Sequence, residues 1–183
     1  MENFALDSIK IKSNWFDGES KSMFQKMGKE KGLELYLQLF RYRVHQGDIN
    51  EHHFITSVGE LQKHLNVNVK SKPSLTKIVE MLERFEELGI IKNHSFKDWS
   101  LLYKKENDQG KIHTDKLIKL EATDVPNTTR EFKGKDSRGN DMYEDVPETE
   151  NDKYINITFE VVNEIYNRNL NSKAMSLFFF LRK

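Results

Sequence analysis

Apolar residues recur at helical spacing between residues 57 and 89 and divide this stretch into two amphipathic helices. In the first helix, Val58, Leu61 and Leu65 lie on one face. The second helix has a longer apolar stripe and ends at Gly89, after which a strand begins. The stripe consists of Leu75, Ile78, Val79, Leu82, Phe85 and Leu88. The pattern therefore predicts a helix, a polar break, a second helix and a strand.

A third helix is predicted upstream, over residues 29–46, and is followed by a short strand around Phe54 and Ile55. Apolar residues cover two sides of this helix, so we expect it to be buried against the rest of the domain or a second copy. Ser57 is placed to cap the helix after the strand, with Glu60 as its capping-box partner.

The order of these elements is that of a helix-turn-helix followed by a wing. Residues 96–118 contain two apolar runs joined by a charged connection, which we interpret as a wing of more than minimal length. We therefore predict an α+β, mainly helical fold: a winged helix-turn-helix with an extended wing and extra C-terminal helices.

The same pattern divides the chain into four parts. We interpret residues 1–28 as an N-terminal arm that packs or pairs, and residues 29–123 as the winged-helix domain. Residues 124–152 are charged, poor in apolar residues and carry a turn signal at 137–140, so they form either a polar hairpin or a polar linker. We favour a linker containing a weak hairpin. We interpret residues 153–183 as a C-terminal helical segment that opens with a strand-like alternation over residues 154–158. Its last helix is so apolar that it either packs on the first domain or dimer, or opens a second winged-helix domain absent from this chain.

Composition narrows the cellular setting without naming a partner. Lysine plus arginine and aspartate plus glutamate each number 29, so only local patches of charge can indicate a binding surface. The absence of cysteine excludes disulfides and cysteine-ligated metal sites. The N-terminus does not resemble a signal peptide, and no apolar run approaches the ~18 residues of a membrane span. We therefore expect a cytoplasmic protein that does not bind a membrane.

The strongest local charge pattern is the stretch between Glu60 and Glu80, which contains no acidic residue. It covers the turn and the first half of the second helix, where helix-turn-helix proteins contact base edges and phosphates. Exposed amides at a helix N-terminus also favour phosphate. The candidate DNA-binding residues are Lys63, Asn68, Lys70, Ser71, Lys72, Ser74, Thr76 and Lys77, together with Lys104, Lys105 and Lys111 in the wing.

Neither a metal site nor an enzymatic site is predicted. The adjacent pair His52 and His53 would point apart in any regular structure, so we interpret the histidines as surface or loop residues. The acidic residues of 141–152 lack calcium-loop spacing and are interpreted as solvated charges. No phosphate-binding glycine loop or nucleophile motif is present in the sequence, so we expect a protein that is not an enzyme and needs no cofactor.

Three segments of residues 29–92 carry a family resemblance: Gly-Leu-Glu-Leu-Tyr-Leu-Gln-Leu-Phe-Arg, Phe-Ile-Thr-Ser-Val-Gly-Glu-Leu and Ile-Val-Glu-Met-Leu-Glu-Arg-Phe-Glu-Glu-Leu-Gly-Ile-Ile-Lys. This part of the chain resembles the N-terminal winged-helix domains of replication-initiation proteins from plasmids and phages of Gram-positive bacteria, including the DnaD-like group. The resemblance implies origin binding, dimer formation and recruitment of host replication proteins. Residues 154–183 are similar to the opening of a second winged-helix unit, as in two-domain plasmid initiators.

Together these observations predict sequence-specific binding of double-stranded DNA by a non-catalytic homodimer, with a role as a plasmid or phage replication initiator. One alternative within DNA binding is a winged-helix transcriptional regulator. An alternative from a different class is a winged-helix scaffold that binds only protein.

Overall fold

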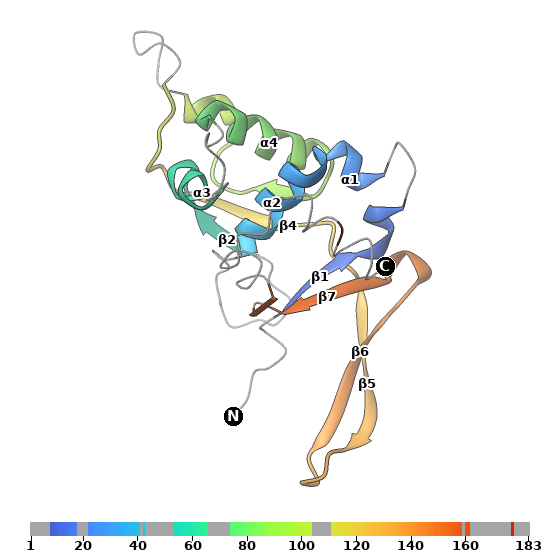
Figure 1. Cartoon of the computed structure of the whole chain (residues 1–183). Helices are drawn as coiled ribbons and strands as arrows, with labels where there is room; N and C mark the ends of the chain where they lie inside the picture. Colours follow the sequence, from blue (N-terminus) through green and yellow to red (C-terminus); the bar gives the residue numbers. More distant parts are fainter. Residues whose placement is uncertain are drawn as a thin grey trace.

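The computed structural model is an α+β structure in which a long hairpin projects from a body of helices and short strands (Figure 1). The structure describes residues 8–17, 22–40, 42, 53–65, 74–103, 111–158, 160, 161 and 177. About 40% of these residues lie in helices and 31% in strands.

Three helices account for much of the body. They are α2 (Lys29–Phe40), α3 (Val58–His64) and α4 (Leu75–Glu87). The Ser57 hydroxyl caps α3 by accepting a hydrogen bond from the Glu60 N–H at 3.2 Å. The Ser74 hydroxyl caps α4 in the same way, from the Lys77 N–H at 3.2 Å. α4 is followed by Gly89, whose φ of 70° is the left-handed conformation that glycine adopts without strain. The cap at Ser57 and the helix end at Gly89 therefore lie where the sequence predicts them, whereas the cap at Ser74 was not predicted.

α2 is buried on all its sides. Every residue from Gly32 to Phe40 is buried, including Gln38, whose Nε2 donates to the His64 carbonyl at 3.1 Å. A Cβ atom on Gly32 would lie 2.0 Å from the Met27 carbonyl oxygen, so the close approach of the two backbones requires glycine. The expectation of a fully buried helix is confirmed for these residues.

The first sheet has three antiparallel strands with the last one in the middle. β4 (Ile118–Ala122) lies between β2 (His53–Thr56) and β3 (Ile91–Asn93). Side chains alternate between the two faces, so the cross-strand pair Phe54 and Leu120 is buried in the core.

A second sheet joins the two ends of the described chain. β1 (Ser8–Lys12) pairs antiparallel with β7 (Tyr154–Thr158), and Ile9 and Ile11 of β1 are both buried. The short helix α1 (Met23–Lys26) follows and contacts α2. The N-terminal arm predicted to pack or pair is therefore a strand of the body.

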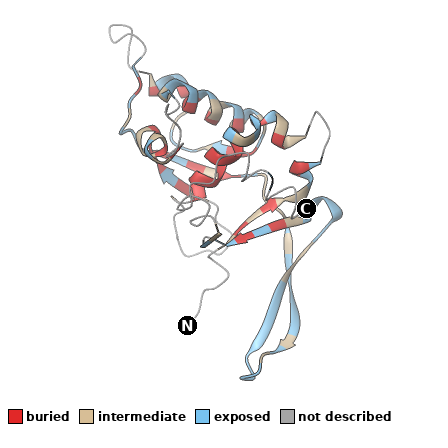
Figure 2. Cartoon of the chain, in the orientation of Figure 1, coloured by how far each residue is buried: buried red, intermediate tan, exposed pale blue. Residues whose placement is uncertain are grey.

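Aromatic rings connect this arm to the helices and to the first sheet. Trp15 lies edge-on to Tyr36 with ring centroids 5.0 Å apart, and Tyr36 contacts Phe40 at 5.1 Å and Phe85 at 6.4 Å. Phe40 contacts Phe54 of β2 at 4.9 Å. Figure 2 shows the buried residues collected where these elements meet. The arm, α2, α4 and β2 therefore share one core.

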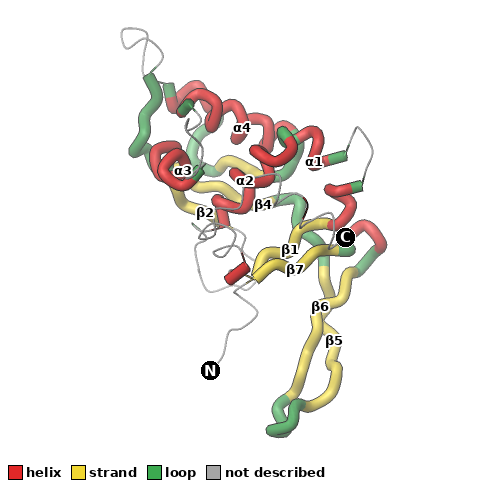
Figure 3. The backbone as a smooth tube through the Cα atoms, viewed as in Figure 1, coloured by secondary structure: helices red, strands yellow, loops and turns green. Residues whose placement is uncertain are grey.

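The third sheet is the projecting hairpin of β5 (Thr128–Lys135) and β6 (Asp141–Pro147), which extends away from the helices in Figure 3. Exposed apolar side chains lie on both strands, among them Phe132 and Tyr143, whose rings are 5.7 Å apart. The sequence left a polar hairpin or a polar linker open here and favoured the linker with a weak hairpin. The structure instead has a paired hairpin along most of this segment.

A buried carboxylate lies at the base of this hairpin. Asp152 is 5% exposed, and its oxygens accept hydrogen bonds from the Thr149 hydroxyl at 2.6 Å and from the Asn127 N–H at 3.0 Å. Lys12 Nζ of β1 lies 3.9 Å away. The bond from Thr149, followed by the bond from Asn127, lowers the pKa of Asp152 below its usual range.

Replacing Asp152 with asparagine should lower the stability of the protein at neutral pH, and the deficit should shrink in acid. Because the pKa is lowered in the folded state, the stabilisation is complete above the ordinary pKa of an aspartate and is lost as the pH falls through the lowered value. Urea unfolding of both proteins across this pH range measures the effect. A deficit that stays constant from neutral to acidic pH would rule out this explanation.

The predicted fold class is wrong. The prediction was an α+β but mainly helical winged helix-turn-helix, whereas the described residues have four helices and seven strands in small sheets and are not mainly helical. The winged helix is not confirmed. Apolar periodicity underestimated the strand content. The β5–β6 hairpin has no clear apolar alternation, and β1 pairs with β7 although the two strands lie far apart in the sequence. Most of the expected extra C-terminal helices fall outside the described residues.

Candidate nucleic-acid interface

The N-terminal turn of α4 combines exposed polar side chains with a firm attachment to the core. Ser74, Thr76 and Lys77 are exposed, whereas Ile78 and Val79 are buried. No acidic residue lies in this first turn. The first N–H groups of a helix lack partners within the helix and carry a partial positive charge. This turn therefore has the chemistry that binds a phosphate group.

Beyond the first turn, the exposed face of α4 is mostly acidic, with Arg84 as an exposed cation among the carboxylates. Glu80 and Glu87 are exposed and Glu83 is partly buried. Burial raises the pKa of Glu83, and the negative charges of Glu87, Asp98 and Glu80 raise it further. This accumulation of negative charge would repel phosphates, so a DNA contact on α4 is restricted to its first two turns.

Lys63 lies at the end of α3 and is exposed, but its charge is paired. Its Nζ donates a hydrogen bond to the Glu60 carboxylate one turn earlier. This bond raises the pKa of Lys63 and lowers the pKa of Glu60. Lys63 would have to leave Glu60 in order to contact a phosphate.

The segment expected to be an extended wing has a different structure in its described parts. Within residues 96–118, a 3-10 turn (Trp99–Leu102) replaces the expected apolar strand. The Trp99 Nε1 donates to the Glu86 carboxylate of α4 at 2.6 Å, and Leu102 is fully buried. This first apolar run of the expected wing therefore does not project, because Trp99 is hydrogen-bonded to α4 and Leu102 is buried. Ile118, at the end of the expected wing, begins β4, which pairs with β3. Residues 104–110 lie outside the described part of the chain.

The residues on either side of 104–110 are paired with each other. Tyr103 forms an isolated antiparallel bridge with Ile112, the residue next to Lys111. Burial raises the pKa of Tyr103, and the charges of Glu83 and Glu80, in the middle of α4, raise it further. Lys111 is exposed.

Five members of the predicted DNA-binding set lie in the described part of the chain, namely Lys63, Ser74, Thr76, Lys77 and Lys111. Lys63 is at the end of α3, Ser74, Thr76 and Lys77 are at the start of α4, and Lys111 adjoins the Tyr103–Ile112 bridge. The other members lie outside the described residues, and these are Asn68, Lys70, Ser71, Lys72, Lys104 and Lys105.

The cations of the projecting hairpin are arranged differently. Lys133 lies 3.2 Å from the Glu131 carboxylate and 3.4 Å from that of Glu144, and Lys135 lies 3.6 Å from the Asp141 carboxylate. These lysines are balanced by acidic neighbours within the hairpin. The hairpin is therefore a weaker candidate for a phosphate-binding surface than the first turn of α4.

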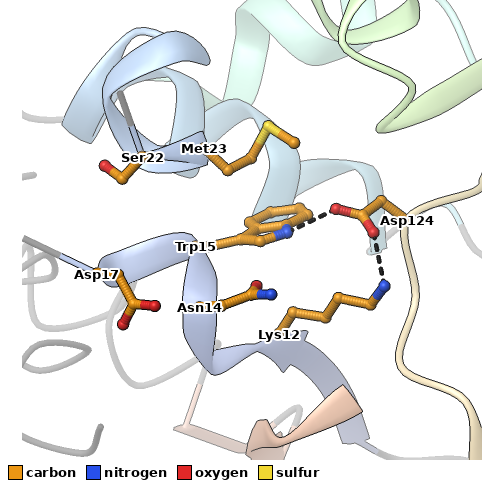
Figure 4. Close-up of a pocket in the computed structure, with 7 residues that line it drawn as sticks. All are labelled: Lys12, Asn14, Trp15, Asp17, Ser22, Met23 and Asp124. Atoms are coloured by element: carbon orange, nitrogen blue, oxygen red, sulfur yellow. Dashed lines mark hydrogen bonds and ion pairs between the residues drawn. The ribbon is translucent and has the colours of Figure 1, made fainter. Parts of the chain in front are cut away.

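A surface hollow of about 370 Å³ lies between the N-terminal arm and the body (Figure 4). Its charged groups contact one another: Asp124 accepts a hydrogen bond from Trp15 Nε1 at 2.7 Å and pairs with Lys12 Nζ at 2.8 Å. Because these contacts attach the arm to the body, we assign the hollow a structural role.

Comparisons with known proteins add no relative. No family model, curated protein or solved structure matches the chain significantly. Within the described residues, no helix combines the length and apolar character that crossing a membrane would require.

Proposed function

We propose that the protein binds double-stranded DNA and that the first two turns of α4 contact the DNA. The observation that carries the proposal is the exposed, acid-free first turn of α4, capped by Ser74 and bearing Thr76 and Lys77. An α-helix with its side chains is about 10–12 Å wide, which fits the major groove of B-DNA. Lys77 would contact a phosphate, and Thr76 is short enough to reach a base edge.

Neighbouring cations support the same surface. Lys111 is exposed next to the Tyr103–Ile112 bridge, and Lys63 at the end of α3 is available if it exchanges Glu60 for a phosphate. The acidic second half of α4 sets the orientation, because a helix lying flat in the groove would bring Glu87 against the backbone. We infer that α4 enters with its N-terminal end.

The biological role rests on the sequence of residues 29–92, whose resemblance favours a plasmid or phage replication initiator that recruits host replication proteins. A transcriptional regulator would use the same surface. An autonomous-replication assay with the gene and its flanking DNA distinguishes these roles, because only an initiator supports replication.

A homodimer belongs to this proposal. It is supported by the exposed apolar side chains of the hairpin, which include Phe132, Met142 and Tyr143. A two-fold dimer would read half-sites about one helical turn apart, or a multiple of it. Sedimentation with and without DNA measures the mass, and a monomer in both states would remove the dimer from the proposal.

Selection from a random pool of duplexes, followed by fluorescence anisotropy, tests the binding itself. We expect a preferred duplex whose affinity falls as salt rises, with about one unit of slope in log K for each phosphate contacted by a cation. Failure to bind any duplex at low salt would contradict the proposal and would favour the protein-binding scaffold.

A further inference from the structure

Three side chains that ligate metals converge on the outer face of the three-stranded sheet. They are His53 of β2, His94 directly after β3, and Glu121 of the central strand β4. Each offers one ligand atom, and these atoms all lie within 4.8 Å of one another. The three residues are far apart in the sequence and are brought together by the pairing of the strands.

The sheet register explains why they share a face. His53 lies directly opposite Glu121 in the β2–β4 pair. On the other side, Lys92 lies opposite Glu121, and His94, two residues further on, projects to the same face as Lys92. The alternate residues of β4 are buried, so this face is directed away from the core.

The contacts within the cluster are already short. The His94 Nε2 and a Glu121 carboxylate oxygen are 2.6 Å apart, and the rings of His53 and His94 have centroids 5.5 Å apart. A hydrogen bond explains the His94–Glu121 contact without a metal, but it does not explain why the His53 imidazole lies beside them. A divalent ion would replace the proton between His94 and Glu121 and add His53 as the third ligand.

The chemistry of this set selects the kind of ion. Two imidazoles and one carboxylate are the protein ligands of many three-ligand zinc sites, in which water takes the remaining position. Magnesium and calcium prefer oxygen ligands, so two imidazole nitrogens disfavour both. Lys92 opposite Glu121 adds positive charge beside the site, which lowers affinity for any cation but does not change this preference.

We propose that His53, His94 and Glu121 form a binding site for one divalent transition-metal ion, zinc in the first instance. The ion would tie both outer strands, β2 and β3, to the central strand β4. It would stabilise the folded state by an amount that grows with the ratio of the free zinc concentration to the Kd, because an unfolded chain does not hold the three ligands together. This proposal does not depend on DNA binding.

Isothermal titration of the metal-free full chain with zinc chloride tests the site, with magnesium chloride as the comparison. We expect one zinc ion per chain, no binding of magnesium at the same concentrations, and a rise in melting temperature with zinc alone. Single substitutions His53→Gln, His94→Gln and Glu121→Gln should each weaken zinc binding by about tenfold or more, as losses around a metal site do. The matched control is His113→Gln, because His113 is an exposed histidine outside the cluster.

Circular dichroism of each variant without metal shows whether it is folded, and only folded variants are compared. Because variants can unfold, X-ray absorption of the zinc-loaded natural chain provides an independent readout. We expect a nitrogen and oxygen shell at about 2.0–2.1 Å with scattering from two imidazoles. Zinc binding that is unchanged in both His94→Gln and Glu121→Gln, a shell with fewer than two imidazoles, or no zinc binding at all would overturn the proposal.

Discussion

Replacing Thr76 and Lys77 together with alanine should weaken binding of the selected duplex about tenfold or more. Loss of a base-contacting side chain costs roughly 1–3 kcal/mol at its own position, and loss of one phosphate-contacting lysine removes about one unit of the salt slope. Both side chains are exposed in the first turn of α4, so their removal should leave the core intact. Anisotropy titrations at several salt concentrations measure affinity and slope together.

The matched control is Arg84→Ala. Arg84 is also an exposed cation on α4, but it lies two turns further along the helix, beside Glu83 and Glu87. Removing it should change the affinity much less. Equal losses for the two variants would mean that α4 contributes only general positive charge, and undiminished binding by the double variant would exclude its first turn from the interface.

Replacing Trp15 with alanine should lower the free energy of unfolding by roughly 3–5 kcal/mol, the usual cost of removing a buried tryptophan side chain. Trp15 is 1% exposed, contacts Tyr36 of α2, and donates a hydrogen bond to Asp124 at 2.7 Å. The arm that carries it is therefore expected to be part of the cooperative fold. Urea unfolding followed by circular dichroism measures the change.

A Trp15→Phe variant separates packing from hydrogen bonding. It keeps an aromatic ring against Tyr36 but removes the donor to Asp124, so its cost should be about 1–3 kcal/mol. If Trp15→Ala cost less than Trp15→Phe, or if both were neutral, the arm would not belong to the core as the structure has it.

Local patterns predicted the helices well. The apolar stripes, the cap at Ser57 and the helix end at Gly89 gave α3 and α4 to within a residue or two, because capping and helical periodicity are properties of neighbouring residues. The buried character of α2 was also predicted, since few polar residues are available to face solvent.

Pairing between distant segments was much harder to predict. The alternation in residues 154–158 indicated a strand. Nothing in that pattern identifies β1, near the other end of the described chain, as its partner. The hairpin β5–β6 gave little signal because most of its side chains are exposed on both faces, although the turn residues 137–140 marked its tip. The cluster of His53, His94 and Glu121 was missed for the same reason, as only the sheet register brings the three residues together.

Site-specific photo-crosslinking from α4 tests the proposed function most directly. A photoreactive amino acid is placed at position 76 in one variant and at position 87 in another, both exposed positions of the same helix. Each variant is irradiated with its preferred duplex at equal occupancy. We predict crosslinks to DNA from position 76 and none from position 87. A bound duplex that crosslinks from position 87, or that fails to crosslink from position 76, would contradict entry of α4 by its N-terminal end.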